Sequence, residues 1–216
     1  MPGRKALSDP ELAAVLDAAR LFPRRAQALL ILGVNTGYRI HELLSLTVGQ
    51  VWDGTTVRPC VCVARARLKG GRGSRRRAVT SRVIPLNARC AAALTPYLQT
   101  RAAGGTGHPA AWLFPSRQGQ GPLSADQANR IVKRIIEAAG LEAGGPWGTH
   151  TLRKTYCRRI FQLSKFNLVL TKAAMGHAHL STTERYLTAT EDAAAAVIKA
   201  LGEERPANFA VNQQIA

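Results

Sequence analysis

Between residues 150 and 186 the chain carries side chains suited to chemistry on a phosphodiester. His150 and Arg153 form a His-x-x-Arg motif, Gly176 and His177 form a Gly-His pair, and Tyr186 follows nine residues later. Arginine presents a planar fork of donors that matches phosphate oxygens, and histidine exchanges protons near neutral pH. A tyrosine phenol can attack phosphorus as a covalent nucleophile once it loses its proton. We infer that this set could carry out phosphoryl transfer without a metal or a nucleotide.

Two helices are expected to position these groups. Apolar residues recur at helical spacing through the stretch, first at Leu152, Tyr156, Ile160 and Leu163 and then at Leu168, Leu170 and Met175. We expect these apolar positions to bury one face of each helix. The polar side chains would then project together from the opposite face.

The rest of the chain predicts a mainly α protein with a small antiparallel β-sheet, an α+β fold. Ser8, followed by Pro10 and Glu11, predicts a capped helix start. Further helices are expected over about 24–35, 39–46, 88–101, 124–139 and 191–201, and strands over about 60–68 and 81–86. An Asp53-Gly54 turn precedes the strands. The basic, glycine-rich loop between the strands lacks the GxxxxGK[ST] order of a P-loop.

The charge of the chain favours a polyanionic partner. Lysine and arginine exceed aspartate and glutamate by 30 − 13, a formal net charge of +17, and no acidic residue occurs between Asp53 and Asp126. Nucleic acid is the favoured partner, because no basic amphipathic helix with an aromatic face suggests an anionic membrane. The candidate DNA-binding residues in this interval are Arg65, Arg67, Arg72, Arg75, Arg76 and Arg77.

The cysteines and histidines do not form a metal-binding pattern. Cys60 and Cys62 alternate in an expected strand and so point to one face, without a CxxC pair. His177 and His179 form His-x-His, but no cysteine or acid stands at ligand spacing beside them. We therefore expect no metal and no cofactor. No apolar run approaches the length of about 20 residues that spans a bilayer, and the first residues lack a signal peptide, so the cytoplasm is the expected compartment.

Three separated boxes carry a resemblance to a known family. TGYRIHELLSL at 36–46, HTLR at 150–153 and GHAHLSTTERY at 176–186 stand in the order of the tyrosine recombinase (phage integrase) catalytic domain, with a lysine in an expected turn between them. The resemblance covers about residues 8–190. It implies the fold of that catalytic domain and an enzyme that cleaves and rejoins DNA strands.

The resemblance implies that Arg39 and Arg153 clamp the scissile phosphate. Their fixed positive charge would stabilise the extra negative charge of the pentavalent transition state. Glu42 stands at a common acidic position of the first box and is expected to orient an arginine. Without the resemblance, Arg39 reads equally well as a surface arginine paired with Glu42, three residues on along a helix.

The remaining catalytic roles also follow from the resemblance. Tyr186 is the expected nucleophile, and His150 and His177 are expected to hydrogen-bond the phosphate, with His150 taking the proton of the phenol. Lys69 is the expected general acid for the leaving 5′ oxygen, provided that neighbouring cations lower its pKa. A solvated lysine that only contacts the DNA backbone is the alternative for Lys69.

The implied reaction is site-specific recombination through a 3′-phosphotyrosyl intermediate. A type IB topoisomerase uses similar chemistry, a DNA-binding regulator is a different class, and a catalytic fragment unable to recombine alone is a third alternative. The implied partners are double-stranded DNA and further copies of the chain, as a dimer or tetramer on DNA. Bound to DNA, the protein would lie at the nucleoid.

The expected organisation is a leader at 1–7, a catalytic domain at 8–190, and a C-terminal helix and tail at 191–216. The family usually carries a separate helical domain, which binds the DNA core, ahead of the catalytic domain. Because seven residues precede Ser8 in this sequence, we expect that domain to be missing.

Overall fold

A computed structural model of the chain describes residues 4–63, 82–117, 121–143, 145–177 and 180–184. The chain divides into two units, Met1–Tyr186 and Leu187–Ala216, and all described residues lie in the first. The loop expected between the two strands and the helix expected at 191–201 fall outside the described residues.

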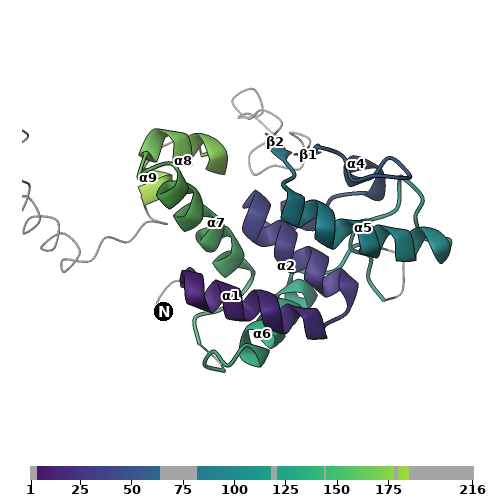
Figure 1. The fold of residues 1–216 in the computed structure, drawn as a ribbon, viewed down its shortest axis with the longest axis horizontal. Coiled ribbons are helices and arrows are strands. Elements are labelled where there is room, and N and C mark those ends of the chain that lie inside the picture. Colours follow the sequence, from purple (N-terminus) through teal and green to yellow (C-terminus); the bar gives the residue numbers. More distant parts are fainter. Residues whose placement is uncertain (1–3, 64–81, 118–120, 144, 178–179, 185–216) are drawn as a thin grey trace, which may run out of the picture. The chain divides into compact units, whose positions relative to one another are not determined.

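Helices make up most of the described part of the chain (Figure 1). In order, the elements are α1 (Asp9–Ala18), the 3₁₀ turn η1 (Ala19–Leu21), α2 (Arg24–Thr36), α3 (Ile40–Leu44), α4 (Val48–Val51), β1 (Cys60–Val63), β2 (Arg82–Pro85), α5 (Ala88–Ala103), α6 (Ala125–Ala138), α7 (Thr149–Leu163), α8 (Leu168–Met175) and α9 (Leu180–Glu184). The expected fold class, mainly α with a small antiparallel sheet, is confirmed. The short helix α4 is not predicted by the sequence patterns above. None of the described helices is both long and apolar enough to cross a membrane.

Side-chain caps set the starts of α1 and α6. Ser8 Oγ accepts a hydrogen bond from the backbone N–H of Glu11 at 3.3 Å, and Glu11 Oε2 accepts from the N–H of Ser8 at 2.6 Å. Ser124 and Gln127 form the same reciprocal pair at 3.1 and 2.9 Å. Such capping boxes satisfy two of the backbone donors that a helix start leaves open. The predicted starts at Ser8 and Ser124 are therefore confirmed.

α2 is the central helix, because both of its faces are buried. Leu29 and Leu32 belong to one apolar cluster, with α3, α4, the sheet and α5, whereas Leu30 and Val34 belong to a second, with α1, α6 and the start of α7. α2 ends at Gly37, whose φ of +58° is left-handed and whose missing Cβ leaves room for the Tyr156 ring of α7. The chain then turns sharply and presents Arg39 beside α7.

The sheet has two strands in antiparallel register. Cys60 pairs with Pro85 and Val63 pairs with Arg82. Val61 and Val63 are buried, whereas Cys60 and Cys62 are exposed on the opposite face, as the period of two predicts. Arg82, which follows the undescribed segment 64–81, therefore lies directly opposite a buried valine of β1.

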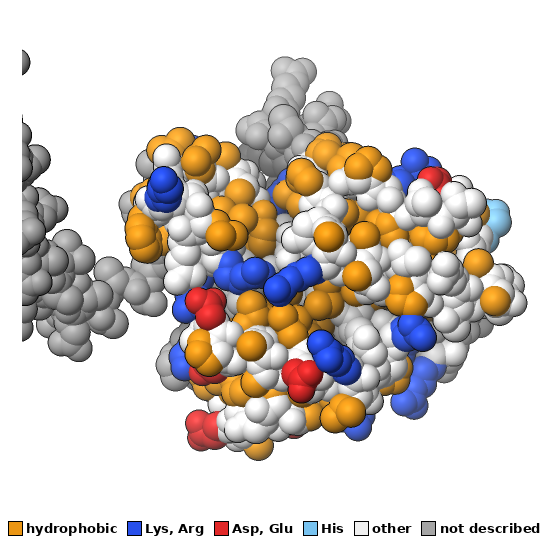
Figure 2. Space-filling view, in the orientation of Figure 1, with side chains coloured by type: hydrophobic (Ala, Val, Ile, Leu, Met, Phe, Trp, Pro, Cys, Tyr) orange, Lys and Arg blue, Asp and Glu red, His pale blue; other side chains and the backbone are white. Residues whose placement is uncertain are grey.

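Two of the apolar positions expected to be buried are exposed, so that prediction was wrong for them. Leu163 at the end of α7 is 76% exposed and Leu170 in α8 is 56% exposed. Phe166 and Val169 are exposed beside them, and hydrophobic side chains are visible over α8 at the upper left of Figure 2. Helical spacing shows which residues share a face but does not show what covers that face. Among the described elements, α8 packs mainly on α7 and α9.

Candidate active site

Arg39 is held by Glu42. The backbone N–H of Arg39 donates to Glu42 Oε2 at 2.7 Å, and Arg39 Nη1 donates to Glu42 Oε1 at 2.9 Å. The Glu42 side chain is 2% exposed, whereas that of Arg39 is 37% exposed. A buried carboxylate that accepts both bonds fixes the direction of the arginine without covering it. Glu42 therefore orients Arg39, which remains accessible to an anion.

Arg153 connects three segments that are distant in the sequence. It lies on α7, is 1% exposed, and donates through Nη1 to the carbonyl of Gly37. Its Nη2 donates to the carbonyl of Met175 at 3.2 Å and lies 2.7 Å from Nε2 of His177. The guanidinium therefore joins the turn before Arg39 to the end of α8. The structure brings the second arginine box and the Gly-His box into direct contact.

The contacts of His177 show which ring nitrogen carries the proton. A guanidinium can only donate, so Nε2 accepts from Arg153, and the proton of the neutral ring lies on Nδ1, 2.9 Å from Thr183 Oγ1. Burial, followed by the charges of Arg153, Arg39 and Arg82, lowers the pKa of His177 to about 4. The imidazole is therefore neutral at physiological pH, and it lies close to three guanidinium groups.

His150 lies on the first turn of α7, three residues before Arg153. Helical residues at this spacing share a face. His150 remains accessible to solvent, and partial burial followed by the charges of Arg153, Lys154 and Arg39 lowers its pKa. A neutral, accessible imidazole beside the arginines is able to accept a proton.

Known proteins resemble this chain in sequence and in structure. The model of the phage integrase family matches residues 5–192. The chain belongs to the phage integrase family. Tyrosine recombinase XerD of Brucella abortus is 30% identical over 175 residues, which cover 80% of this chain and 51% of that protein. The probable integrase/recombinase YoeC of Bacillus subtilis is 36% identical over 91 residues, or 42% of this chain and 48% of YoeC. The chain thus spans about half the length of these curated relatives.

Solved structures of recombinases share the fold. The crystal structure of XerA recombinase matches with a TM-score of 0.70 at 20% identity, over 94% of this chain and 67% of XerA. A complex of XerH site-specific recombinase with a palindromic difH substrate matches with a TM-score of 0.69 at 24% identity, over 92% of this chain and 53% of XerH. These matches confirm the expected catalytic-domain fold.

Several predicted residues of this integrase-family chain lie outside the described residues. They are Lys69, Tyr186 and the arginines Arg65, Arg67, Arg72, Arg75, Arg76 and Arg77. The described part does reach α9, where Thr183 is buried against His177. Thr183 stands three residues before Tyr186 in the sequence. The chain is therefore tied to the arginine–histidine cluster just before the expected nucleophile.

Two site residues were missed by the sequence reasoning. Arg82 of β2 lies with its guanidinium 4.9 Å from the centre of the Tyr38 ring and donates to backbone carbonyls of two of the same segments as Arg153. Thr183 fixes the Nδ1 of His177. Tyr38 is buried, and its hydroxyl lies near the carbonyls of Val61 and Arg82 at 3.1 and 2.9 Å. The acid-free interval contains Arg82, but its partners stand far away in the sequence.

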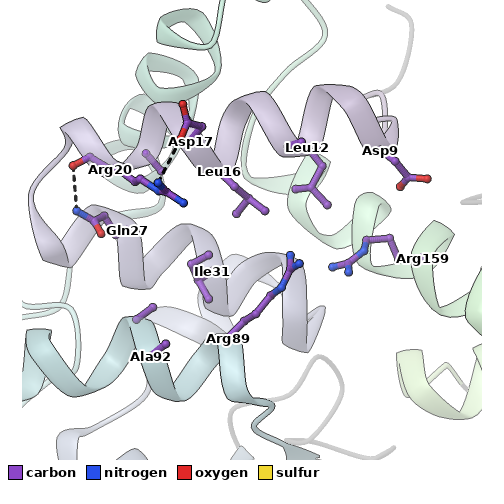
Figure 3. Close-up of a pocket in the computed structure, with 13 residues that line it drawn as sticks. Asp9, Leu12, Leu16, Asp17, Arg20, Gln27, Ile31, Arg89, Ala92 and Arg159 are labelled. Carbon is purple, nitrogen blue, oxygen red and sulfur yellow. Dashed lines mark hydrogen bonds and ion pairs between the residues drawn. The ribbon is translucent and has the colours of Figure 1, made fainter.

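A separate groove of about 770 Å³ lies between α1, α2, α5 and α7. Its floor is apolar, and Arg89 and Arg159 extend into it from α5 and α7 (Figure 3). It contains none of the predicted catalytic residues.

Within the described ranges, no group of three or more His, Cys, Asp and Glu side chains could hold a metal ion. The candidate active site is therefore the cluster of Arg39, Arg82, His150, Arg153 and His177.

Proposed function

We propose that the chain is the catalytic part of a site-specific DNA recombinase that cleaves and rejoins strands through a 3′-phosphotyrosyl intermediate. The observation that carries the proposal is the contact of Arg153 with both His177 and the turn leading to Arg39. Converging guanidinium groups around a neutral imidazole suit a transition state with extra negative charge on phosphorus. Membership of the phage integrase family supports the same reaction.

In the proposed cleavage step, the oxygen of Tyr186 attacks the scissile phosphorus and the bond from phosphorus to the 5′ oxygen breaks. His150 takes the phenol proton, and Lys69 gives a proton to the leaving 5′ oxygen. Arg39 and Arg153 stabilise the phosphoryl charge. A 5′ hydroxyl of another strand then attacks the phosphotyrosine and reverses the step, so no external energy source is consumed.

His177 has a positioning role in the DNA-free chain, because Arg153 and Thr183 engage its two ring nitrogens. A direct hydrogen bond from His177 to the phosphate would require one of these contacts to exchange. Its low pKa keeps the ring neutral, so Nε2 continues to accept from Arg153. We therefore assign His177 to the orientation of Arg153 first and to the phosphate second.

The proposed partner is double-stranded DNA, to which the protein would bind in the cytoplasm, at the nucleoid. The acid-free interval between Asp53 and Asp126 supports electrostatic binding through its arginines. We further propose assembly on DNA as a dimer or tetramer. The predicted helix over 191–201 has an apolar face of Ala194, Val197, Ile198 and Leu201 that would bind a neighbouring copy.

Covalent trapping tests the proposed function. Nicked duplexes of randomised sequence are incubated with the full chain, and protein-bound DNA is recovered under denaturing conditions and sequenced. We expect a covalent complex with the wild type, none with Tyr186→Phe, and no effect of a chelator on the wild type. Absence of the wild-type complex would contradict the proposed function, and loss of the complex with chelator would indicate a metal-dependent reaction.

A further inference from the structure

Arg82 contacts both of the turns that position the arginine–histidine cluster. Its Nη2 donates to the carbonyl of Thr36 at 3.0 Å and to that of Ala174 at 2.7 Å, and its Nη1 donates to the carbonyl of Gly37 at 3.5 Å. Thr36 and Gly37 end α2, and Ala174 is near the end of α8. Carbonyls at helix ends lack helical partners and carry partial negative charge. One guanidinium thus caps two helices.

Arg153 uses the neighbouring acceptors of the same two turns. It donates to Gly37 and Met175, whereas Arg82 donates to Thr36, Gly37 and Ala174. Burial and then the charge of Arg153 lower the pKa of Arg82, whose Nε is buried without a hydrogen-bond partner among the described residues. Two like charges are thus held side by side behind His177.

Gly176, which immediately precedes His177, packs against the Arg82 side chain. Its φ is +62°, and a Cβ there would lie 2.9 Å from Cδ of Arg82. The turn that presents His177 is therefore packed directly on the Arg82 side chain. The other side of the guanidinium covers the ring of Tyr38, which immediately precedes Arg39. Nη1 and Nη2 of Arg82 donate to backbone carbonyls of both turns, so this side chain is suited to hold the two turns together.

We propose that Arg82 is a positioning residue for strand cleavage, which sets the Arg39 turn and the His177 turn at the separation that the scissile phosphate requires. This inference rests on the proposed function. Arg82 is the first described residue after segment 64–81. The charged groups that face His177 come from three elements: Arg39 before α3, Arg82 on β2 and Arg153 on α7.

Two pairs of variants test the proposal. Arg82→Met removes the charge and the donors, and Arg82→Lys keeps the charge but cannot serve both turns. Arg101→Met and Arg101→Lys are matched controls, because Arg101 also lies over a tyrosine ring and donates to backbone carbonyls, at a distance from the site along α5. Thermal unfolding of all four variants shows how much of each loss is a general loss of stability.

The first readout is the titration of His177, followed by NMR in the DNA-free protein. Burial, then the charges of Arg153 and Arg39, and last that of Arg82 lower the pKa of His177 to about 4, so we expect a modest rise in Arg82→Met, a smaller rise in Arg82→Lys, which keeps the charge, and no change in the Arg101 variants. A His177 pKa that is unchanged in Arg82→Met would contradict the proposed influence of Arg82 on the His177 turn. The titration tests the role of Arg82 without DNA. If the wild type forms no covalent complex, the proposed function is contradicted, but the result of the titration still stands.

The second readout is the rate of covalent complex formation at saturating DNA. We expect both Arg82 variants to lose about 10- to 100-fold, because small displacements of reacting groups have effects of that size. Their dissociation constants for DNA should match those of the Arg101 variants. Cleavage by Arg82→Lys at the rate of Arg101→Lys would overturn the proposal, whatever the titration shows. If Arg82→Met does not fold, the cleavage rate of Arg82→Lys relative to that of Arg101→Lys tests the proposal.

Discussion

Two arginine–tyrosine pairs in this chain are built alike but do different things. Arg101 lies 5.9 Å from the centre of the Tyr97 ring, and Arg82 lies 4.9 Å from the centre of the Tyr38 ring. Each arginine donates to backbone carbonyls, and each tyrosine hydroxyl lies near a carbonyl of the same region. An arginine that lies over a tyrosine ring and donates to backbone carbonyls can therefore belong either to an active site or to a purely structural contact.

The difference lies in which segments the acceptors belong to. Arg101 donates to the carbonyls of Thr106, Trp112 and Leu113, all within twelve residues of it. Arg82 donates to carbonyls 45, 46 and 92 residues away. The Arg101 pair fixes one local loop, whereas the Arg82 pair joins the two turns that carry Arg39 and His177.

The surrounding charge differs as well. The charges of Arg39, Arg82 and Arg153 all act on the pKa of His177, and Arg153 lowers the pKa of Arg82. Burying like charges together is unfavourable unless an anion or a hydrogen-bond network offsets it. Glu42 provides part of the offset at Arg39. A bound phosphate would provide more, which is why we place the function at this cluster and not at Arg101.

The largest effect is expected at Arg153. Arg153→Lys keeps a positive charge but cannot contact Gly37, Met175 and His177 at once. Cleavage, measured as the initial rate of covalent complex formation, should fall by about 10³-fold, the upper range for loss of a transition-state donor. Arg101→Lys is the control. Equal rates for the two variants would place the chemistry elsewhere.

Lys69 provides the next largest effect. Lys69→Ala should slow cleavage by about 100-fold on ordinary DNA, because an alkoxide leaving group needs a proton. On a substrate with sulfur in place of the bridging 5′ oxygen the rate should be largely restored, since a thiolate leaves without a proton. Arg153→Lys should stay slow on both substrates. A Lys69→Ala rate that is equally low on both would make Lys69 a backbone contact only.

Arg101 should affect stability and not cleavage. Arg101→Met removes one donor from the carbonyls of Thr106, Trp112 and Leu113, of which Leu113 keeps the Tyr97 hydroxyl, and this should lower the free energy of unfolding by about 1–3 kcal/mol. Denaturant unfolding measures the loss. Below the unfolding transition, the cleavage rate should equal that of the wild type. A large loss of cleavage with the fold intact would show that Arg101 also affects the site, and would contradict the proposed difference between the two arginine–tyrosine pairs.

The smallest effect is a dependence of stability on pH. The pKa of His177 is about 4 in the folded chain against 6.5 for an unperturbed histidine, so between these values the unfolded chain binds more protons. Stability should therefore fall as pH is lowered through this window, by at most about 1.4 kcal/mol per pH unit from this group. His150 contributes in the same direction.

The measurement for this prediction is the unfolding midpoint at pH 7 and pH 5. The wild type should lose more between the two values than His177→Gln, and His108→Gln, which alters an exposed histidine, should behave as the wild type. The lowered pKa values of Glu11 and Asp53 affect stability mainly below this range. Equal losses in the wild type and His177→Gln would mean that His177 is not buried in its neutral form.

Much of the fold could be predicted because its signals are local. Ser8 and Ser124 set helix starts through residues three positions away, and Gly37 ends α2 through its own φ. The spacing of Cys60 and Cys62 predicted that they share one face of β1, and the structure shows that the opposite face, with Val61 and Val63, is the buried one. Leu163 and Leu170 were predicted incorrectly, since burial depends on what lies against a face and not on spacing.

Residues of the candidate site could be predicted where they stand in sequence boxes, and could not be predicted where one residue contacts backbone carbonyls far away in the sequence. Arg39, Arg153 and His177 stand in recognisable boxes, and the structure brings them together. Arg82 binds carbonyls, which every residue has, so no pattern of side chains marks its partners. Thr183 lies inside the third box, but its hydrogen bond to Nδ1 of His177 spans six residues, a spacing that does not by itself predict a contact.

We propose that the arginine–histidine cluster serves a tyrosine that forms a covalent bond to DNA. The most direct test is to trap the covalent complex, trim its DNA with nuclease, digest the protein with trypsin and locate the remaining nucleotide by tandem mass spectrometry. We expect a nucleotide joined through its 3′ phosphate to Tyr186, at the start of the peptide that spans residues 186–199. A nucleotide on Tyr38, Tyr97, Tyr156 or any other residue, or no adduct at all, would contradict it.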